Sequence, residues 1–271
     1  MKYTIKDLLA DFPDDNVCLD YIFAKKYPES EGYYRVKGRK CWSHKTTKHQ
    51  IHPLKGTIFE KSSTPLTLWF HAIFLFSSSK NGVSAKELQR QLGVTYKCAW
   101  RMAKQIRSLM EQDGDLLTGT VEVDETYIGG RKKGTAGRGA KGKTSVVGLV
   151  ERGGSVKAFA TNNVNSTTLT GLVYHNVDRS AKVMTDEFGG YNYVKLHNEH
   201  ETVAHGKKQY VRGNVHTNTI EGFWGQLKRS VRGTYVHVSK KHMQSYINEF
   251  AFRYNLRASS VPIFEVLLAR V

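Results

Sequence analysis

The chain has 271 residues, of which 39% are hydrophobic, and it carries 41 lysines and arginines against 24 aspartates and glutamates. This length accommodates two compact domains or one large domain with a small appendage, and the apolar fraction excludes a disordered chain. The formal net charge of +17 makes nucleic acid the leading class of partner, because a basic surface concentrates phosphate groups.

Other features argue against secreted, disulfide-stabilised and membrane proteins. The three cysteines are scattered and form no CxxC pair, which fits a reducing compartment. The amino-terminal stretch carries acids early and has no apolar segment typical of a secretion signal. The most apolar run, Leu68–Phe76, is too short to span a bilayer, and we find neither a long basic amphipathic helix nor a lipidation signal. We therefore expect a soluble, cytoplasmic protein that binds nucleic acid and no membrane.

The first part of the chain, residues 1–60, is rich in lysine, histidine and tyrosine and weak in periodicity, so we expect a small, irregular module. A helix is predicted over Thr64–Ser78, with Thr64 as its N-cap and Pro65 at the first helical position.

Residues Gly82–Met110 have the pattern of a helix-turn-helix, in which Thr95 caps the second helix. Five apolar residues recur at core-facing spacings: Leu88, Leu92, Ala99, Met102 and Ile106. The second helix would present cations and aromatic rings outward, namely Tyr96, Lys97, Trp100, Arg101 and Lys104. Such a face suits a DNA groove and its phosphates, and an ordinary helical hairpin is the alternative.

From Leu116 the pattern changes to strands: LLTGTVEVDETYIGG, SVVGLVER, SVKAFATNN and KVMTDEFGGY, with a helix over STTLTGLVYHNV. We expect an α/β fold with a central mixed sheet flanked by helices. A glycine-rich basic segment between the first two strands contains Arg131, Lys132 and Lys133. This segment is interpreted either as a solvated loop or as an arm that binds the phosphate backbone.

Three acids are placed at the ends of predicted elements: Asp124 closes the first strand, Asp186 closes a later strand, and Glu221 opens a helix. Acids that converge inside a basic protein need a cation between them, because uncompensated like charges repel each other. Two Mg²⁺ ions about 4 Å apart would serve, and they would clamp the oxygens of a phosphodiester. The neighbouring Glu122, Glu125 and Glu187 leave the assignment open by a residue or two.

The helix within NVHTNTIEGFWGQLKRSVRG has a buried stripe at helical spacing, formed by Ile220, Trp224, Leu227 and Val231. Lys228 lies two turns after Glu221, and with Arg229 and Arg232 it is a candidate ligand for DNA phosphate. In a purely structural interpretation, Asn218 is the N-cap and Glu221 completes a capping box.

Several motifs occur together: VEVDETYIGGR, VMTDEFGGY, VHTNTIEGFWGQLKR, the ending GTYVHVSKKHMQSYINEFAFRYN, and an upstream segment that begins GTIFEKSS. In this combination the chain resembles the DDE transposases of bacterial insertion sequences, in the ISXO-like group related to the eukaryotic Merlin elements. The resemblance extends from about Gly56 to Asn255. It implies a ribonuclease H-like catalytic domain with Asp124, Asp186 and Glu221 as metal ligands and with Lys228 as a further active-site residue.

The amino-terminal end departs from the family pattern, whose members carry a zinc ribbon with two CxxC pairs. Here the second pair falls on His44 and Thr47, and no first pair is visible. Cys41, His44, His49 and His52 offer potential ligands at a spacing that is not a standard zinc pattern, so we expect no bound zinc. The predicted domains are a degenerate zinc-ribbon-like DNA-binding module at 1–60, a helix-turn-helix region at 61–112 and a ribonuclease H-like DDE domain at 113–271.

The resemblance implies a transposase that binds the inverted repeats at the element's ends, cuts a strand there and transfers the exposed 3′ hydroxyl to target DNA. Two Mg²⁺ ions are the expected cofactors, with Mn²⁺ able to substitute. The expected partner is double-stranded DNA, from the element ends and the target, and joining two ends requires a homodimer or a larger assembly. One alternative is a non-catalytic DNA-binding relic or a domesticated regulator; another is a ribonuclease H-like nuclease for RNA or branched DNA.

Overall fold

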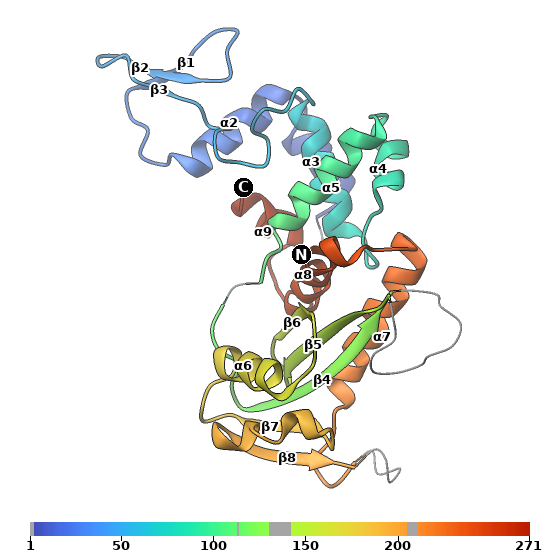
Figure 1. Cartoon of the computed structure of the whole chain (residues 1–271). Helices are drawn as coiled ribbons and strands as arrows, with labels where there is room; N and C mark the ends of the chain where they lie inside the picture. Colours follow the sequence, from blue (N-terminus) through green and yellow to red (C-terminus); the bar gives the residue numbers. More distant parts are fainter. Residues whose placement is uncertain (1–2, 113, 130–141, 205–210) are drawn as a thin grey trace. The chain divides into compact units, whose positions relative to one another are not determined.

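A computed structural model of the chain (Figure 1) describes residues 3–112, 114–129, 142–204 and 211–271. The chain divides into two compact units, of which the first comprises Met1–Leu109 with Ser259–Val271 and the second comprises Met110–Ala258. The predicted regions 1–60 and 61–112 lie almost wholly in the first unit. Within the described ranges, no helix is both long enough and apolar enough to cross a membrane.

The first unit is mainly helical and includes a small antiparallel sheet with the strand order β1-β2-β3. Its elements are α1 (Ile5–Asp11), α2 (Asp15–Lys26), β1 (Tyr33–Arg35), β2 (Trp42–His44), β3 (Gln50–Ile51), α3 (Leu66–Ser78), α4 (Ala85–Leu92), α5 (Tyr96–Ser108) and α9 (Ile263–Ala269). The expectation of an irregular amino-terminal module is wrong for α1 and α2. Side chains cap both helices: Asp14, for example, accepts the backbone N–H groups of Asn16 and Val17 at 2.7 and 3.0 Å.

Helix α3 is apolar on nearly every side and forms the core of the first unit. Helix α9, from the far end of the chain, packs against it through Phe264, whose ring centroid lies 6.5 Å from that of Phe70 and 6.3 Å from that of Phe74. The predicted start of α3 is wrong by one residue. Pro65, and not Thr64, occupies the capping position with an extended backbone, and no side chain caps the first turn.

Helices α4 and α5 form the predicted helical pair. Gly93 ends α4 in the left-handed conformation (φ 65°), and the Thr95 hydroxyl caps α5 by accepting the N–H of Cys98 at 3.3 Å, as predicted. All five predicted core residues are buried: Leu88, Leu92, Ala99, Met102 and Ile106. The use of this pair in DNA recognition stays a prediction.

The second unit is a five-stranded mixed sheet covered on both faces. Its elements are β4 (Thr120–Ile128), β5 (Thr144–Glu151), β6 (Val156–Thr161), α6 (Ser166–Asn176), β7 (Lys182–Asp186), η1 (Gly189–Tyr191), η2 (Val194–Leu196), β8 (Glu199–Val203), α7 (Asn218–Ser230), the π-helical η4 (Val231–Tyr235), η5 (Lys240–His242) and α8 (Met243–Asn255). The strand order is β6-β5-β4-β7-β8. Strands β4, β5 and β6 pair antiparallel, whereas β7 lies parallel to both β4 and β8. The predicted mixed sheet with flanking helices is confirmed.

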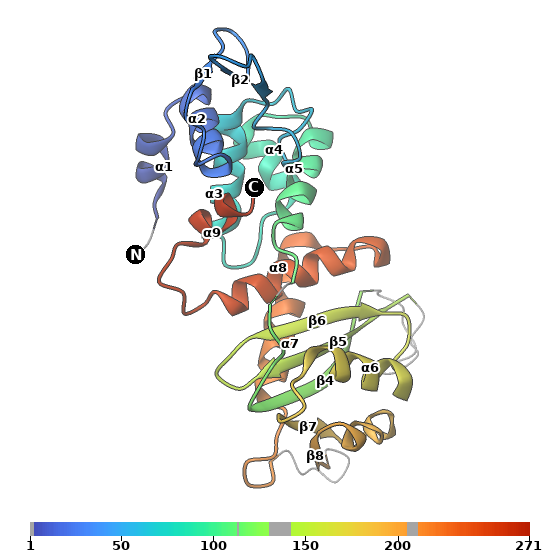
Figure 2. The same ribbon diagram turned by 90° about the vertical axis from the view of Figure 1, so that its left-hand side faces the viewer.

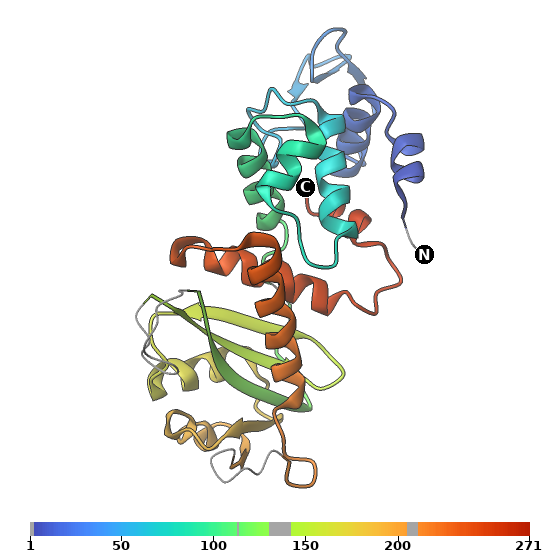
Figure 3. The same cartoon turned by 90° about the vertical axis from the view of Figure 1, so that its right-hand side faces the viewer.

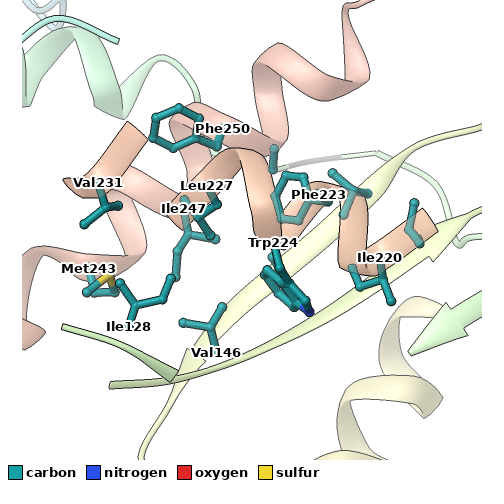
Figure 4. Packing of buried hydrophobic residues seen from close by; sticks show 14 of the residues in the cluster. Ile128, Val146, Ile220, Phe223, Trp224, Leu227, Val231, Met243, Ile247 and Phe250 are labelled. Atoms are coloured by element: carbon teal, nitrogen blue, oxygen red, sulfur yellow. The ribbon is translucent and has the colours of Figure 1, made fainter. Parts of the chain in front are cut away.

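Alternating side chains of the strands build two cores, one on each face of the sheet. On one face, α6 lies over the strands (Figure 2), and α6 and Tyr191 belong to a core with Val121, Val123 and Val183. On the other face, α7 runs along β4 and β5 (Figure 3) and α8 packs on β6. Figure 4 shows Trp224 and Ile220 of α7 directed toward the strands. The two helices thereby cover the sheet face that carries Asp124.

Candidate active site

Two of the three candidate acids lie on neighbouring strands. The expectation that Asp124 closes its strand is wrong, because β4 pairs with β5 as far as Ile128 and Asp124 therefore lies in its middle. Asp186 is the last residue of β7, as predicted. The last parallel pair of β4 and β7 is Glu122 with Met184, and Asp124 and Asp186 each lie two residues beyond it. The charge of Asp186 acts on Asp124, so the two carboxylates are near each other.

Asp124 has two negatively charged neighbours, Glu125 and Asp186. Burial, the charge of Glu125 and the charge of Asp186 together raise its pKa from 3.8 to about 7. On the opposite face of the strand, the Tyr191 hydroxyl donates to Glu125 at 2.7 Å. Burial and the same acids raise the pKa of Tyr191 well above its usual value. The carboxylates are therefore held together in spite of their mutual repulsion.

Crowded carboxylate oxygens are the donors that Mg²⁺ and Mn²⁺ take in proteins, so Asp124 and Asp186 fit a hard divalent cation. Among the side chains that the structure describes, however, no three of the His, Cys, Asp and Glu types are close enough together to hold an ion. A third ligand would have to approach this pair, and α7 carries the candidate.

The Asp124 carboxylate is held in place from α7. The indole N–H of Trp224 donates to Asp124 Oδ2 at 3.0 Å. Gly148 of β5 lies directly opposite Asp124, and a Cβ atom at this position would approach the Trp224 ring to 2.6 Å. The missing side chain of Gly148 thus leaves room for the indole. The buried stripe of α7 is confirmed, but the sequence pattern did not reveal this second role of Trp224.

Glu221 lies in the first turn of α7 and is exposed. The capping-box interpretation is wrong, because the helix begins at Asn218 with Thr217 in the capping position. The Thr217 hydroxyl instead donates to Glu221 Oε1 at 3.1 Å. Glu221 precedes Trp224 by three residues, so it lies one helical turn from the residue that contacts Asp124.

A buried carboxylate of the sheet caps α7. Glu122 is completely buried and accepts the backbone N–H groups of Thr219 and Ile220 at 2.8 and 3.1 Å. It also accepts the Thr219 hydroxyl at 2.9 Å and Arg152 Nε at 2.7 Å, and His216 Nδ1 lies 3.1 Å away. Glu122 thereby fixes the start of α7 to β4. Glu122 lies two residues before Asp124, so strand alternation places both carboxylates on the same face of β4. This spacing is the feature of the sequence that could have indicated a contact of Glu122 with α7.

Lys228 follows Trp224 by four residues and is partly buried. Burial, Arg232 and Lys143 lower its pKa, whereas the nearby Asp124 carboxylate opposes this shift. Lys228 is therefore close both to Asp124 and to the cations Arg232 and Lys143. Arg229 and Arg232 are exposed, as a role in phosphate binding requires.

The DNA-binding candidates of α5 are largely accessible. Tyr96, Lys97 and Lys104 are exposed, with the Lys104 ammonium 5.9 Å from the ring centroid of Trp100. Arg101 is partly buried and donates to the Glu60 carbonyl at 2.9 Å, so it also holds the preceding loop. Arg131, Lys132 and Lys133 lie outside the described residues.

Of the four potential zinc ligands of the first unit, His44 and His49 contact other groups of the chain. Cys41 is buried, His44 Nδ1 accepts the backbone N–H groups of Thr46 and Thr47, and His49 Nδ1 lies 2.8 Å from the Tyr33 hydroxyl. These contacts lie within the three-stranded sheet and the turn that follows β2. Whether this module binds zinc stays a prediction.

Known proteins show the same relationship that the motifs indicated. Residues 116–255 match the family model described as the ISXO2-like transposase domain. A protein described as an uncharacterized protein in transposable element ISH50 of Halobacterium salinarum is 28% identical over 240 residues, which cover 82% of this chain and 80% of that protein. These two matches confirm the resemblance to insertion-sequence transposases.

A solved structure also aligns with the chain. It is the cryo-electron-microscopy structure of a simian T-cell lymphotropic virus intasome in complex with PP2A regulatory subunit B56 gamma. The sequence identity is 13% and the TM-score is 0.35, and the alignment covers 64% of this chain and 66% of that one, slightly less than two thirds of its length.

Proposed function

The chain belongs to the ISXO2-like transposase family, and on that premise we propose that it cuts DNA at the ends of an insertion sequence and transfers the cut strand to target DNA. The observation that carries this proposal is the proximity of Asp186 to Asp124, which lie on two paired strands and close enough for the charge of Asp186 to act on Asp124. In a protein with a formal net charge of +17, repelling carboxylates beside cationic side chains are suited to a metal-dependent reaction of phosphodiesters.

The proposed catalytic domain is ribonuclease H-like. Its mixed sheet, with α7 and α8 on one face and α6 on the other, supports this assignment. Asp124 and Asp186 would hold Mg²⁺ or Mn²⁺ together with Glu221. Two bound ions would supply charge stabilisation for the attacking and leaving oxygens of the phosphodiester.

The chain's own side chains would position the reacting groups. Trp224 keeps the Asp124 carboxylate oriented, and Thr217 does the same for Glu221. Lys228 would bind a phosphate next to the acids. In the first step water attacks the phosphodiester at the element end, and the leaving group is a 3′ hydroxyl. In the second step that hydroxyl attacks target DNA and displaces a target 3′ oxygen, so no covalent bond to the protein forms.

Recognition of the element ends is proposed for α5. Its exposed Tyr96, Lys97 and Lys104 would contact DNA, together with Arg101 at their margin. Arg229 and Arg232 would contact the backbone near the acids. Two ends must be joined to one target, so two or more copies of the chain would assemble on double-stranded DNA.

The test is Mg²⁺-dependent cleavage and strand transfer on DNA that carries the gene's own flanking ends, with wild-type protein beside Asp186→Asn. We expect cleavage at a defined position, abolished by Asp186→Asn with end binding retained. Asp115→Asn, which changes an exposed acid of the same unit, is the matched control and should cleave normally.

Two outcomes would contradict the proposal. Tight binding of the ends without cleavage by the wild type would establish a DNA-binding relic or regulator. Cleavage of RNA–DNA hybrids in place of element ends would establish a nuclease.

A further inference from the structure

A cavity of about 680 Å³ opens at the carboxyl end of α7, within the second unit. Its volume lies in the range of about 300–1,000 Å³ that is typical of small-molecule sites. Lys228 is one of its lining residues, and the charge of the Asp124 carboxylate acts on Lys228. The cavity therefore adjoins the acidic pair of the candidate active site.

One part of the cavity lining is cationic. Three cations line it, Lys143, Lys228 and Arg232, next to the imidazole of His237, and none of the described lining residues is acidic. The positive charges of Arg232 and Lys143 disfavour the charged form of Lys228, so these groups lie close enough to repel one another. An anion bound among them would remove that repulsion, and phosphate is the anion that a basic DNA-binding protein meets.

The other part of the lining is apolar and rigid. Ile128, Val231 and Val238 are buried members of the core between α7, α8 and the sheet, and they present part of their surface to the cavity. Such a wall fits the flat face of a nucleobase, whose contact with water is unfavourable once it leaves the base stack.

The rim of the cavity is strained. After α7 the chain passes through the π-helical segment η4, and Val236 follows with φ 60° and ψ −51°. The N–H of His237 donates to the Tyr235 carbonyl at 2.6 Å, so Val236 is the central residue of a γ-turn of the rare, strained kind. A β-branched residue rarely adopts this conformation, and Val236 is 80% exposed. Strain of this kind is found where structure serves a ligand, and exposed apolar side chains act as wedges between bases.

We propose that this cavity binds one unpaired nucleotide of the DNA strand that is engaged at the acidic pair. Its phosphate contacts Lys143, Lys228, Arg232 and the imidazole of His237, its base lies against the apolar wall, and Val236 separates it from the paired bases. A base that remains paired in a duplex cannot enter a concave site, so the strand end must be locally opened. This inference rests on the proposed function, and it assigns roles to Lys143, Val236 and His237 that the reaction itself does not require.

The experiment compares two DNA probes bound to the full-length protein without divalent metal. One probe is a blunt duplex, and the other is the same duplex with a short single-stranded thymidine overhang. The ratio of the two dissociation constants isolates the unpaired nucleotides, because general charge attraction acts on both probes. We expect the wild type to bind the overhang probe about tenfold tighter.

The variants Lys143→Ala, His237→Ala and Val236→Gly should each reduce this preference to about threefold or less. Lys240→Ala is the matched control, because it removes an exposed cation from the same segment outside the cavity lining. This variant should bind both probes more weakly by the same factor, so the ratio of the dissociation constants should not change. A wild-type ratio near one, or an unchanged ratio in all three cavity variants, would overturn the proposal.

The outcome is separable from that of the cleavage test. Asp186→Asn should retain the preference for the overhang, since it lacks only the acid. If cleavage fails in the wild type and the preference persists, the proposed function is wrong and the cavity remains a nucleotide site. If cleavage is normal and the cavity variants behave like Lys240→Ala, only the cavity proposal is wrong.

Discussion

At its first turn α7 is fixed to the sheet by the buried carboxylate of Glu122, whereas its last turn leads into a π-helical segment and the strained Val236. At the first end, the Glu122 carboxylate accepts two N–H groups of the helix and one from the Arg152 guanidinium. The second end collects cations around a cavity. Polar groups at the first end thus stabilise the fold. Those at the second end line the cavity that we propose as a nucleotide site.

The same contrast is seen between two carboxylates of β4, one of which has a structural role and one a proposed catalytic role. Glu122 and Asp124 are two residues apart on the same strand face, and both contact α7. Glu122 is surrounded by donors, whereas Asp124 has the Trp224 indole as a donor and negative neighbours. Satisfied charge stabilises a protein, and uncompensated charge destabilises it until a ligand binds. Four substitutions test this contrast.

Glu122→Gln should have the largest effect on stability. The substitution removes the buried charge that faces Arg152 and His216, so we expect a loss of about 3 kcal/mol in the free energy of unfolding. Urea denaturation measures it. Glu199→Gln is the control, since Glu199 forms an exposed ion pair with Lys182 and its loss should cost less than about 0.5 kcal/mol. Equal effects would contradict the anchoring role of Glu122.

Gly148→Ala should follow, with a loss of about 2 kcal/mol from overpacking against the rigid Trp224 ring. The same change should weaken Mg²⁺-dependent cleavage, because the indole that orients Asp124 must move. Gly171→Ala in α6 is the matched control: nothing lies within 4 Å of the added Cβ, and the change should stabilise by about 0.5–1 kcal/mol. A neutral Gly148→Ala would show that Trp224 adapts easily.

Asp124→Asn should stabilise the metal-free protein while abolishing cleavage. Because the pKa of Asp124 is raised from 3.8 to about 7, the folded state loses stability as the pH rises between these values. We expect the free energy of unfolding of the variant to exceed that of the wild type by about 1–2 kcal/mol at pH 8, and this difference to shrink toward pH 5. Thermal unfolding across this pH range is the measurement, with Asp115→Asn as a control whose difference from wild type stays constant. A pH-independent difference would contradict the electrostatic origin.

Val236→Gly should have the smallest effect, a stabilisation of about 0.5–1 kcal/mol, because relief of the positive φ exceeds the entropy cost of glycine. Val211→Gly, at another exposed valine of the second unit, should instead destabilise slightly. Differential scanning calorimetry compares the two. Destabilisation by both would mean that Val236 packs in a way that offsets its strain.

Regular periodicity made much of the fold predictable. The buried stripe of α7, the core face of α4 and α5, and four strands of the central sheet follow from alternation and helical spacing alone. Strand β8 was not expected, because its sequence, EHETV, is polar and lies at the sheet edge, where burial imposes little pattern. Helices α1 and α2 were not predicted. Their apolar residues show weak helical periodicity, and their capping residues, Thr4 and Asp14, are short-range signals.

The site was predictable at the level of residue type and family motif, and less so in its geometry. The sequence indicated Asp124 and Asp186 but not that they would lie on two strands that pair in parallel. The roles of Glu122 and Gly148 depend on contacts with α7, which lies far away in the chain. Spacing within one segment cannot reveal such contacts, because they are set by the packing of the helix on the sheet.

The return of α9 to the first unit makes the second unit an insertion in the chain order. During synthesis the ribosome completes every strand of the central sheet before it releases Phe264, which packs with Phe70 and Phe74. The second unit can therefore fold while the chain is still growing, whereas the first unit waits for its last helix. A chain that stops after Ala258 would keep both acids of the paired strands and lose part of the core beneath the helices proposed to recognise DNA.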